Sequence, residues 1–250
     1  MNIIASLSIR PEQASLWFLG QAGYLIRAGG ITAVIDPYLS DSVAKVSPEA
    51  SRLIPVPIPP QELQVDLFLV THDHLDHLDP ETIAPYRFKD KTIFVAPSRA
   101  CRKLVALGVP ESRIVRVDRG GQATIRDVTI QGIYALPTEP AVADTTGYRL
   151  QFLNGRSLYH SSDTGPAEEL FSRAPNAEVL VVCINGKWGN LNIAQAVHLA
   201  QAVRPKVAIP NHYDMMAGNQ EDPGEFVRKM RAEAPDIKVQ ILQVLEPFIW

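Results

Sequence analysis

Cysteine is scarce in this sequence of 250 residues, which contains only Cys101 and Cys183. Each lies in an apolar stretch, where a cysteine most simply acts as a small buried side chain, so no disulfide framework is indicated. The sequence also lacks any run of about 20 apolar residues, the length that a membrane span requires. Its N-terminus has no basic segment followed by a long apolar run, so we expect no signal peptide and a cytoplasmic location.

Charge of a single sign is also lacking. The sequence has 24 Lys and Arg against 27 Asp and Glu, a formal net charge of −3, and the basic residues form no stripe. The charge pattern therefore gives no reason to expect a nucleic acid or an anionic membrane as a partner. A content of 46% hydrophobic and 20% charged residues excludes a disordered polyelectrolyte and is typical of a globular, enzyme-sized protein.

Strand-like and helix-like stretches alternate in both halves of the sequence. Among the helices, we predict one over residues 98–108, opened by Ser98, and one over 193–203, capped by Asn192. Apolar runs between turn signals predict strands before and after these helices. Because no linker interrupts the chain, we expect residues 1–250 to form a single domain of two packed halves, each a mixed β-sheet covered by helices.

The most informative stretch is THDHLDH at residues 71–77, directly after an apolar run. Its H-x-H-x-D-H spacing comes from His72, His74, Asp76 and His77. Three imidazoles and a carboxylate at this spacing can turn two sets of ligands toward two adjacent metal ions. With only 6 histidines in the whole sequence, chance is a poor explanation for the cluster. We therefore predict a metal site here rather than a solvated polar loop.

Three other predicted strand ends supply further donors. Asp36 lies in VIDP, Asp163 in SSDTG and His212 in PNHYD, and each follows an apolar run. Loops at one rim of a sheet can converge on a site, so these residues can meet the histidine cluster. Alone, an Asp before Pro or Thr is more commonly a turn residue. Together with the cluster, the three are candidate ligands or orienting groups.

The motifs VIDP, THDHLDHLD, YHSSDTG and PNHYD, in this order, resemble the metallo-β-lactamase superfamily and, within it, the L-ascorbate-6-phosphate lactonase-like metal-dependent hydrolases. The resemblance implies an α/β fold, a four-layer αβ/βα sandwich of two mixed β-sheets flanked by helices. It also implies two divalent metal ions, zinc or manganese, at the rim between the sheets. The ligands it implies are His72 and His74 for one ion, Asp76, His77 and His212 for the other, and a bridging Asp163. Asp36 would orient the ligands without binding a metal ion itself. Asp76, Asp163 and His212 would be the catalytic residues.

The sequence departs from the superfamily pattern in one place. Many members have a further histidine that completes the ligands of the first ion, but no histidine lies between His77 and His160. Glu139 is the nearest carboxylate that can act as an additional metal ligand, with Thr138 or a water as other options and a plain turn residue as the structural alternative. More oxygen donors favour harder ions such as Mn²⁺, whereas the general order of affinities favours Zn²⁺.

Four polar residues are candidates for substrate binding: Lys187, Asn190, Tyr213 and Asp214. The first two lie in a glycine-containing loop before a predicted helix, where they can hold an anionic group or merely support the helix start. The other two follow His212 directly and can contact the substrate or position that ligand. The two histidines that are not among the implied ligands, His160 and His198, are predicted to be structural.

The predicted chemistry is hydrolysis. Paired cations lower the pKa of a shared water and stabilise the oxyanion formed on an acyl carbon. We therefore expect a metal-dependent hydrolase that opens a lactone or related ester of a small molecule, with an anionic, phosphorylated sugar acid as one candidate. The alternatives are a metal-dependent phosphodiesterase and a catalytically degenerate, metal-binding member of the fold. Relatives assemble, so a homo-oligomer is compatible with the resemblance.

Overall fold

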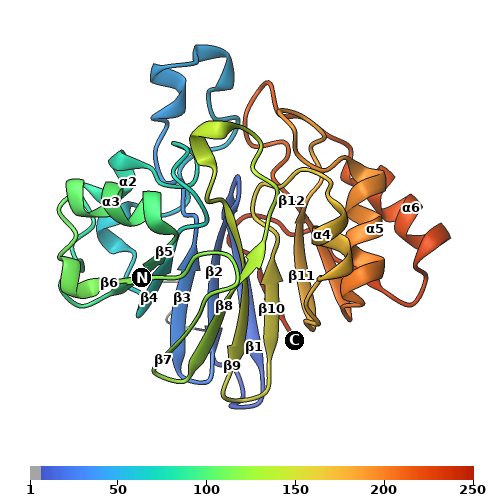
Figure 1. The fold of residues 1–250 in the computed structure, drawn as a ribbon, viewed down its shortest axis with the longest axis horizontal. Helices are drawn as coiled ribbons and strands as arrows, with labels where there is room; N and C mark the ends of the chain where they lie inside the picture. Colours follow the sequence, from blue (N-terminus) through green and yellow to red (C-terminus); the bar gives the residue numbers. More distant parts are fainter. Residues whose placement is uncertain (1–6) are drawn as a thin grey trace.

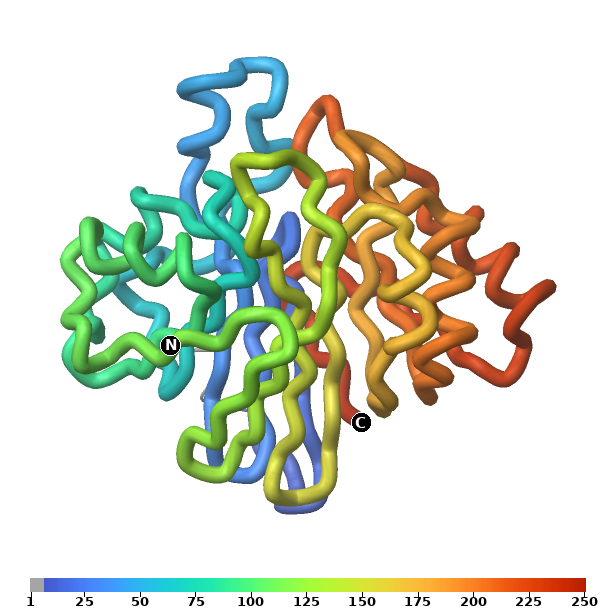
Figure 2. The backbone as a smooth tube through the Cα atoms, viewed as in Figure 1, coloured from blue at the N-terminus to red at the C-terminus, as the bar shows by residue number. Residues whose placement is uncertain are grey.

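Two seven-stranded β-sheets packed face to face form the centre of the structure, a computed structural model that describes residues 7–250 (Figure 1). Helices cover the outer face of each sheet, as the backbone tube also shows (Figure 2). One sheet carries α2 (Pro80–Ile83) and α3 (Ser98–Ala106), and the other carries α4 (Glu168–Ser172), α5 (Ile193–Val203) and α6 (Pro223–Glu233). This four-layer arrangement confirms the predicted αβ/βα fold class.

The first sheet combines an antiparallel and a parallel part. Its strands are β1 (Ala14–Gly20), β2 (Gly23–Ala28), β3 (Ile31–Ile35), β4 (Leu67–Leu69), β5 (Ile93–Ala96), β6 (Ile114–Arg116) and β14 (Pro247–Ile249). They lie in the order β14-β1-β2-β3-β4-β5-β6. The pairs from β14 to β3 are antiparallel, and those from β3 to β6 are parallel. Gly29 and Gly30, with φ of 56° and 80°, form the tight turn between β2 and β3.

The second sheet repeats this mixture. Its strands are β7 (Gln122–Ile125), β8 (Val128–Tyr134), β9 (Thr146–Phe152), β10 (Ser157–His160), β11 (Val179–Cys183), β12 (Val207–Asn211) and β13 (Lys238–Val239). They lie in the order β13-β12-β11-β10-β9-β8-β7, antiparallel from β7 to β10 and parallel from β10 to β13. Short 3₁₀ helices lie in the connections: η1 (Val43–Lys45), η2 (Pro48–Ala50), η3 (Pro60–Glu62), η4 (Glu111–Arg113) and η5 (Pro140–Val142).

The inward faces of both sheets share an apolar core. Leu16 and Tyr24 of the first sheet pack in the same cluster as Tyr148 and Leu158 of the second. Alternate residues of each strand point inward, because side chains in a strand alternate between its two faces. The shared core fixes the two sheets against each other, so loops at the same end of both sheets face a common site.

The starts of the two predicted helices differ in how they are capped. Asn192 caps α5 as predicted, because its side chain accepts a hydrogen bond from the backbone N–H of Gln195 in a capping box. Ser98 is not the cap of α3 but its first residue. Its backbone N–H and its hydroxyl donate to the two carboxylate oxygens of Asp118, so this side chain ties the helix start to the chain after β6 instead.

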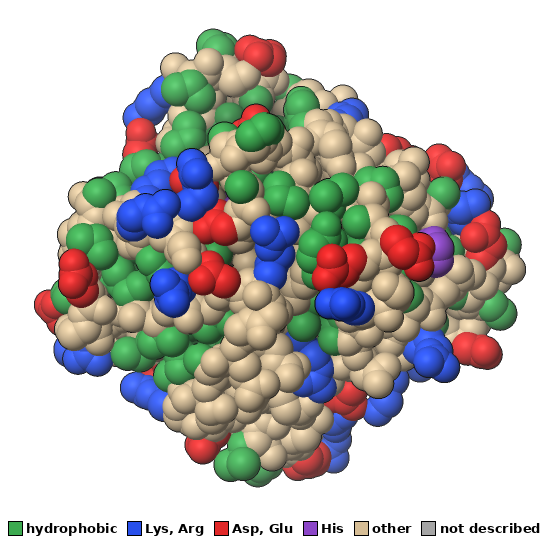
Figure 3. Space-filling view, viewed as in Figure 1, with side chains coloured by type: hydrophobic (Ala, Val, Ile, Leu, Met, Phe, Trp, Pro, Cys, Tyr) green, Lys and Arg blue, Asp and Glu red, His purple; other side chains and the backbone are tan. Residues whose placement is uncertain are grey.

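The surface carries charges of both signs. Figure 3 shows Lys and Arg side chains interspersed with Asp and Glu over one face, in keeping with the small net charge. Within residues 7–250, no helix has the length and hydrophobicity that crossing a bilayer takes. Both cysteines are free thiols, as their apolar sequence surroundings indicate.

Candidate metal centre

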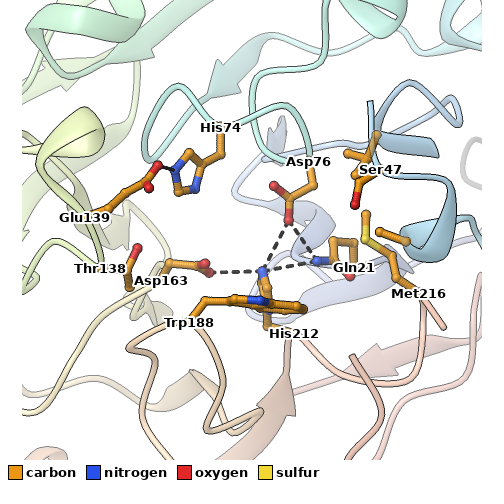
Figure 4. Close-up of a pocket in the computed structure, with 12 residues that line it drawn as sticks. Gln21, Ser47, His74, Asp76, Thr138, Glu139, Asp163, Trp188, His212 and Met216 are labelled. Atoms are coloured by element: carbon orange, nitrogen blue, oxygen red, sulfur yellow. Dashed lines mark hydrogen bonds and ion pairs between the residues drawn. The ribbon is translucent and has the colours of Figure 1, made fainter. Parts of the chain in front are cut away.

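Loops at one end of the sandwich bring the predicted site residues together (Figure 4). β1, β3 and β4 run in the same direction, so the loops with Gln21, Asp36 and residues 71–77 leave the first sheet at one edge. β10 and β12 are likewise codirectional, and the loops after them carry Asp163 and His212. Gln21, Asp36 and His212 have φ of 54°, 44° and 62°. Such left-handed values in non-glycine residues persist where the surrounding structure holds them, and they are frequent at functional sites.

The donor side chains form two groups. The His77 group consists of Asp76, His77 and His212, and the His72 group consists of His72, His74 and Asp163. Within each group, one ligand atom of each residue lies within 4.8 Å of those of the other two. Histidines 72 and 74 thus stand apart from residues 76, 77 and 212, in the division that the resemblance implies.

The spacing of donor atoms in the His77 group fits one tetrahedral cation. Nε2 of His77 and Nε2 of His212 are 3.3 Å apart, and they lie 3.4 and 3.3 Å from Oδ2 of Asp76. Oδ1 of Asp163 lies 3.4 Å from the first nitrogen and 3.2 Å from the second. Donors bound at 2.0–2.1 Å around a tetrahedral ion are separated from one another by about 3.3 Å. The five separations that involve the two imidazole nitrogens therefore match those around a tetrahedral divalent cation.

Asp163 carries a further sign of this fit. Its Oδ2 accepts a hydrogen bond of 3.0 Å from Nδ2 of Asn190, but its buried Oδ1 accepts none. A buried carboxylate oxygen without a donor is costly and calls for an explanation. Oδ1 faces the ring nitrogens of His77 and His212, while Asp163 also belongs to the His72 group. The carboxylate thus lies where it can face cations in both groups.

The electrostatics of the His77 group favour a positive charge. Burial lowers the pKa of His77, but the carboxylates of Asp76, Asp163 and Asp36 outweigh burial and hold this pKa well above its usual value. Burial raises the pKa of Asp76, yet the charges and hydrogen bonds of His77 and His212 hold it well below its usual range. Burial also raises the pKa of Asp163, but the charges of His212 and His77 hold this pKa below its usual value. Carboxylates that stabilise protonated imidazoles in this way also stabilise a metal cation between them.

His72 has the opposite character. Burial lowers its pKa well below the usual value, and the neighbouring charge of His77 adds to this effect. Its Nε2 lies 3.0 Å from Nδ1 of His74, and its Nδ1 lies 3.0 Å from Oγ1 of Thr71. The imidazole is therefore neutral, which is the form that binds metals.

Hydrogen bonds from neighbouring side chains hold the imidazole rings of the candidate ligands in place. Oδ2 of Asp36 lies 2.7 Å from Nδ1 of His77, and the same carboxylate accepts hydrogen bonds from the backbone N–H and the hydroxyl of Thr71. Nδ2 of Asn219 lies 3.2 Å from Nδ1 of His212 and donates to the backbone carbonyl of that residue. Such partners commonly fix the orientation of metal-binding imidazoles. Asp36 thus contacts the ring of His77, the residue that the resemblance makes a ligand.

Two of the residues in contact with the ligands lie outside the predicted set. Gln21 donates through Nε2 to Oδ2 of Asp76 at 2.8 Å, and the same nitrogen is 3.1 Å from Nε2 of His212. Gln21 follows a strand, as the recognised donors do, so its position at a strand end was a usable signal. Asn219 lies in a loop with no motif of its own, and nothing in the sequence indicated it.

Glu139 does not join either ligand group. Its Oε1 lies 2.7 Å from Nε2 of His74, whereas Nδ1 of His74 faces His72. Glu139 directly precedes η5, and its side chain is 53% exposed, so the carboxylate reaches the outer edge of the imidazole. The expectation of an additional ligand is therefore corrected: the structure makes Glu139 a partner of His74 rather than a donor to the ligand group.

The loop with Lys187 and Asn190 also differs from the expectation of substrate binding. Nδ2 of Asn190 holds Asp163, so this buried amide orients a candidate ligand. Nζ of Lys187 donates to the backbone carbonyl of Gln220 at 2.6 Å. Neither side chain lines the cavity above the donor groups. The loop carries its polar groups toward neighbouring loops rather than toward a substrate.

Tyr213 and Asp214 likewise do not line this cavity. Tyr213 packs against the apolar cluster under α5 and α6, and Oδ1 of Asp214 accepts a hydrogen bond from the backbone N–H of Glu221. The chain turns through left-handed conformations at His212 and again at Asp214. This backbone path directs the imidazole into the site and its two neighbours away from it, which corrects the predicted substrate contacts.

The two remaining histidines lie outside both ligand groups. Nε2 of the buried His160 lies 3.2 Å from the carbonyl oxygen of Ala22, and its Nδ1 accepts from the N–H of Ser162. This ring connects the β1–β2 turn with the end of β10. His198 stacks on Phe171 at the surface of α5, with the ring centroids 4.3 Å apart. Both contacts are structural ones.

A cavity of about 500 Å³ opens over the donor groups. Its walls combine four of the candidate ligands with polar and apolar side chains: Gln21, Val43, Ser47, Ala50, His74, Asp76, Thr138, Glu139, Asp163, Trp188, His212 and Met216. A volume of this size suits a small organic molecule. His72 and His77 do not line the cavity, so a substrate would meet the other four candidate ligands.

Comparison with known proteins adds the following. A family model described as a beta-lactamase superfamily domain matches residues 32–213, which include every candidate ligand. A UPF0173 metal-dependent hydrolase from Hyperthermus butylicus is 30% identical over 229 residues, which cover 90% of this chain and 95% of that protein. UlaG from Salmonella heidelberg, described as a probable L-ascorbate-6-phosphate lactonase, is 25% identical over 290 residues, covering 97% of this chain and 80% of its own. The solved structure of the metallo-beta-lactamase fold protein YhfI from Bacillus subtilis matches with a TM-score of 0.70 at 14% identity, over 95% of this chain and 99% of that one.

Proposed function

The chain belongs to the beta-lactamase superfamily and to its metal-dependent hydrolases, and from this premise we propose that it opens a lactone or a related ester of a small molecule. The observation that carries the proposal is the pair of donor groups that share Asp163 beneath a cavity. Two divalent ions, zinc or manganese, would supply hydroxide at neutral pH and polarise the acyl oxygen there. Similarity to a probable lactonase supports an acyl rather than a phosphoryl substrate.

The residues of the chain would hold such a centre ready for the reaction. One ion would be held by Asp76, His77 and His212, the other by His72 and His74, with Asp163 shared between them. Asp36 and Asn190 already fix His77 and Asp163 by hydrogen bonds in the folded chain. Donors that need no rearrangement during the reaction stabilise the developing charge most effectively.

We assign the catalytic work to Asp76, Asp163 and His212, which are three of the four candidate ligands that line the cavity. In the overall reaction, water adds its hydroxyl group to the acyl carbon and its remaining hydrogen to the ring oxygen as the acyl C–O bond breaks. The product is one hydroxy acid. No protein nucleophile is needed, and the two carboxylates and the imidazole would hold the ions at the cavity, next to the reacting group of the substrate.

The decisive experiment compares substrates on protein that has been stripped with a chelator and reloaded with Zn²⁺ or Mn²⁺. We expect two ions per chain by elemental analysis and hydrolysis of γ-butyrolactone only after reloading. Faster turnover of bis(p-nitrophenyl) phosphate than of any lactone would favour the phosphodiesterase alternative. Fewer than one ion per chain, with no gain on reloading, would favour a degenerate member of the fold.

A further inference from the structure

Apolar side chains from separate loops line part of the cavity. Val43 and Ala50 come from the connection between β3 and β4, Trp188 from the loop after β11 and Met216 from the loop after β12. In Figure 4, Met216 lies on the opposite side of the candidate ligands from Glu139. None of the four apolar residues belongs to either donor group. They form a surface that the part of a substrate beyond the reacting group would meet.

Trp188 is the most exposed part of this surface. Its relative exposure is 61%, although indole rings are usually well covered. Its φ of 50° is left-handed, between two glycines, Gly186 and Gly189, with φ of 61° and 85°. Such backbone conformations in bulky residues are uncommon and cluster at ligand sites. An indole held at the edge of a cavity offers a flat apolar face that a bound ligand would cover.

Positive charge is missing from the same cavity. Of the described residues that line it, none is a lysine or an arginine. Nearby cations already have partners: Lys187 donates to the carbonyl of Gln220, and Arg52 donates to the carbonyl of Tyr38 at 2.7 Å. At the rim, the carboxylate of Glu139 adds negative charge. A phosphate group at the far end of a substrate would find no cationic side chain to bind it.

We infer that this site takes an uncharged lactone or ester with an aliphatic arm, the arm packing against Trp188 and Met216, rather than a phosphorylated sugar acid. The inference rests on the proposed function and adds the substrate class to it. The reacting carbonyl would lie over the donor groups, and the arm would cover the apolar lining. Burial of methylene groups, rather than a charged contact, would then supply the binding energy.

The first test is a homologous series of γ-lactones, from γ-butyrolactone to γ-decalactone, with 6-phosphogluconolactone for comparison, on the full chain loaded with metal. We expect kcat/KM to rise about threefold for each added methylene until the cavity is filled. We expect the phosphorylated lactone to react at least tenfold less efficiently than γ-octalactone. A flat series, or a preference for the phosphorylated lactone, would overturn the inference.

The second test uses Trp188→Ala. Because this side chain is exposed, its loss should leave folding intact while lowering the ratio of kcat/KM for γ-decalactone over γ-butyrolactone about tenfold. Trp188→Phe should retain most of the ratio. Leu153→Ala is the matched control, since Leu153 is 75% exposed in the β9–β10 hairpin and should leave the ratio unchanged. An equal loss for both lactones in Trp188→Ala would indicate a merely structural role and contradict the inference.

Binding of γ-lactams with the same alkyl arms, measured by calorimetry, separates the two proposals because lactams resist hydrolysis. Tighter binding with each methylene, lost in Trp188→Ala, supports the inference even if no lactone is turned over, in which case only the proposed function fails. Turnover of short lactones without any dependence on the arm keeps the function and overturns the inference. Absence of both effects overturns both.

Discussion

Two carboxylate–histidine contacts support the candidate metal centre, and they have the same length. Oδ2 of Asp36 lies 2.7 Å from Nδ1 of His77, and Oε1 of Glu139 lies 2.7 Å from Nε2 of His74. Both side chains of the first pair are 0% exposed, whereas those of the second are 53% exposed for Glu139 and 30% for His74. Water screens the second pair, so the buried contact has the greater influence on its imidazole.

This difference indicates a division of labour within the centre. His77 lies away from the cavity and is fixed by a buried carboxylate, whereas His74 lines the cavity and is held only from its exposed edge. One side of the centre therefore preserves the geometry, and the other remains accessible to the substrate. A contact distance alone does not show which role a residue has, because burial decides how strong the contact is.

The largest effect should come from the loss of the side chain that the two donor groups share. Asp163 faces both of them, so Asp163→Ala should lower kcat/KM for lactones at least about 1,000-fold, as expected for a residue that acts together with the whole site. Steady-state kinetics and elemental analysis check this. Asp236→Ala, at an exposed position, is the control and should have no effect. Unchanged turnover in Asp163→Ala would remove this residue from the shared position.

His160 is a buried histidine without a carboxylate partner, and its pKa can be compared with that of His77. Burial lowers the pKa of His160 from 6.5 to about 4, whereas the carboxylates around the equally buried His77 hold its pKa well above the usual value. As the pH falls below 6.5, the unfolded chain takes up a proton at His160 that the folded chain cannot accept until about pH 4. The free energy of unfolding should therefore fall across this range, by up to about 3 kcal/mol from this residue.

Urea denaturation at pH 7 and pH 5 measures this contribution. His160→Gln should lose about 2 kcal/mol less stability than the parent protein between the two pH values. His198→Gln, at an exposed position of α5, is the control for the loss of an imidazole. If His160→Gln lost as much stability as the parent protein between pH 7 and pH 5, the predicted effect of burial on the pKa of His160 would be wrong.

The buried pair itself can be broken by Asp36→Asn. The backbone N–H of Thr71 bonds Oδ1 of Asp36, and the His77 ring faces Oδ2. An amide has only one acceptor oxygen, so it cannot serve both, and the His77 ring loses its orientation. We expect metal affinity to fall 10- to 100-fold, about the effect of removing such a partner in other metal sites. Competition with a chelating dye measures the affinity, and circular dichroism verifies that the variant is folded. An affinity within twofold of the parent protein would contradict the role of this contact.

The smallest effect is expected for the exposed pair. Glu139→Gln removes a charge that water already screens, so metal affinity should change by no more than about threefold in the same dye assay. The variant is the matched counterpart of Asp36→Asn, because each replaces a carboxylate 2.7 Å from an imidazole by its amide. A larger loss in Glu139→Gln than in Asp36→Asn would reverse the comparison.

Some features of the centre were readable from the sequence. Residues 71–77 combine donors at short spacing, and Asp36, Asp163 and His212 each follow an apolar run, which made them candidates. Their separate roles came from the resemblance. The contacts of Lys187 were not readable in this way. Its amine could have pointed to a substrate or to a neighbouring loop, and only the packing of the loop ending at Gln220 directs it to a backbone carbonyl.

The sequence by itself determined the capped start of α5 and the cluster of donors at residues 71–77, because these depend on side chains close together in the chain. The tertiary structure alone decided that Glu139 contacts the outer edge of His74, that Asp214 closes a loop, and that Trp188 borders the cavity. Those outcomes depend on how loops from two sheets meet and on which groups lose contact with water. Burial and left-handed turns are properties of the packed chain, and no local spacing encodes them.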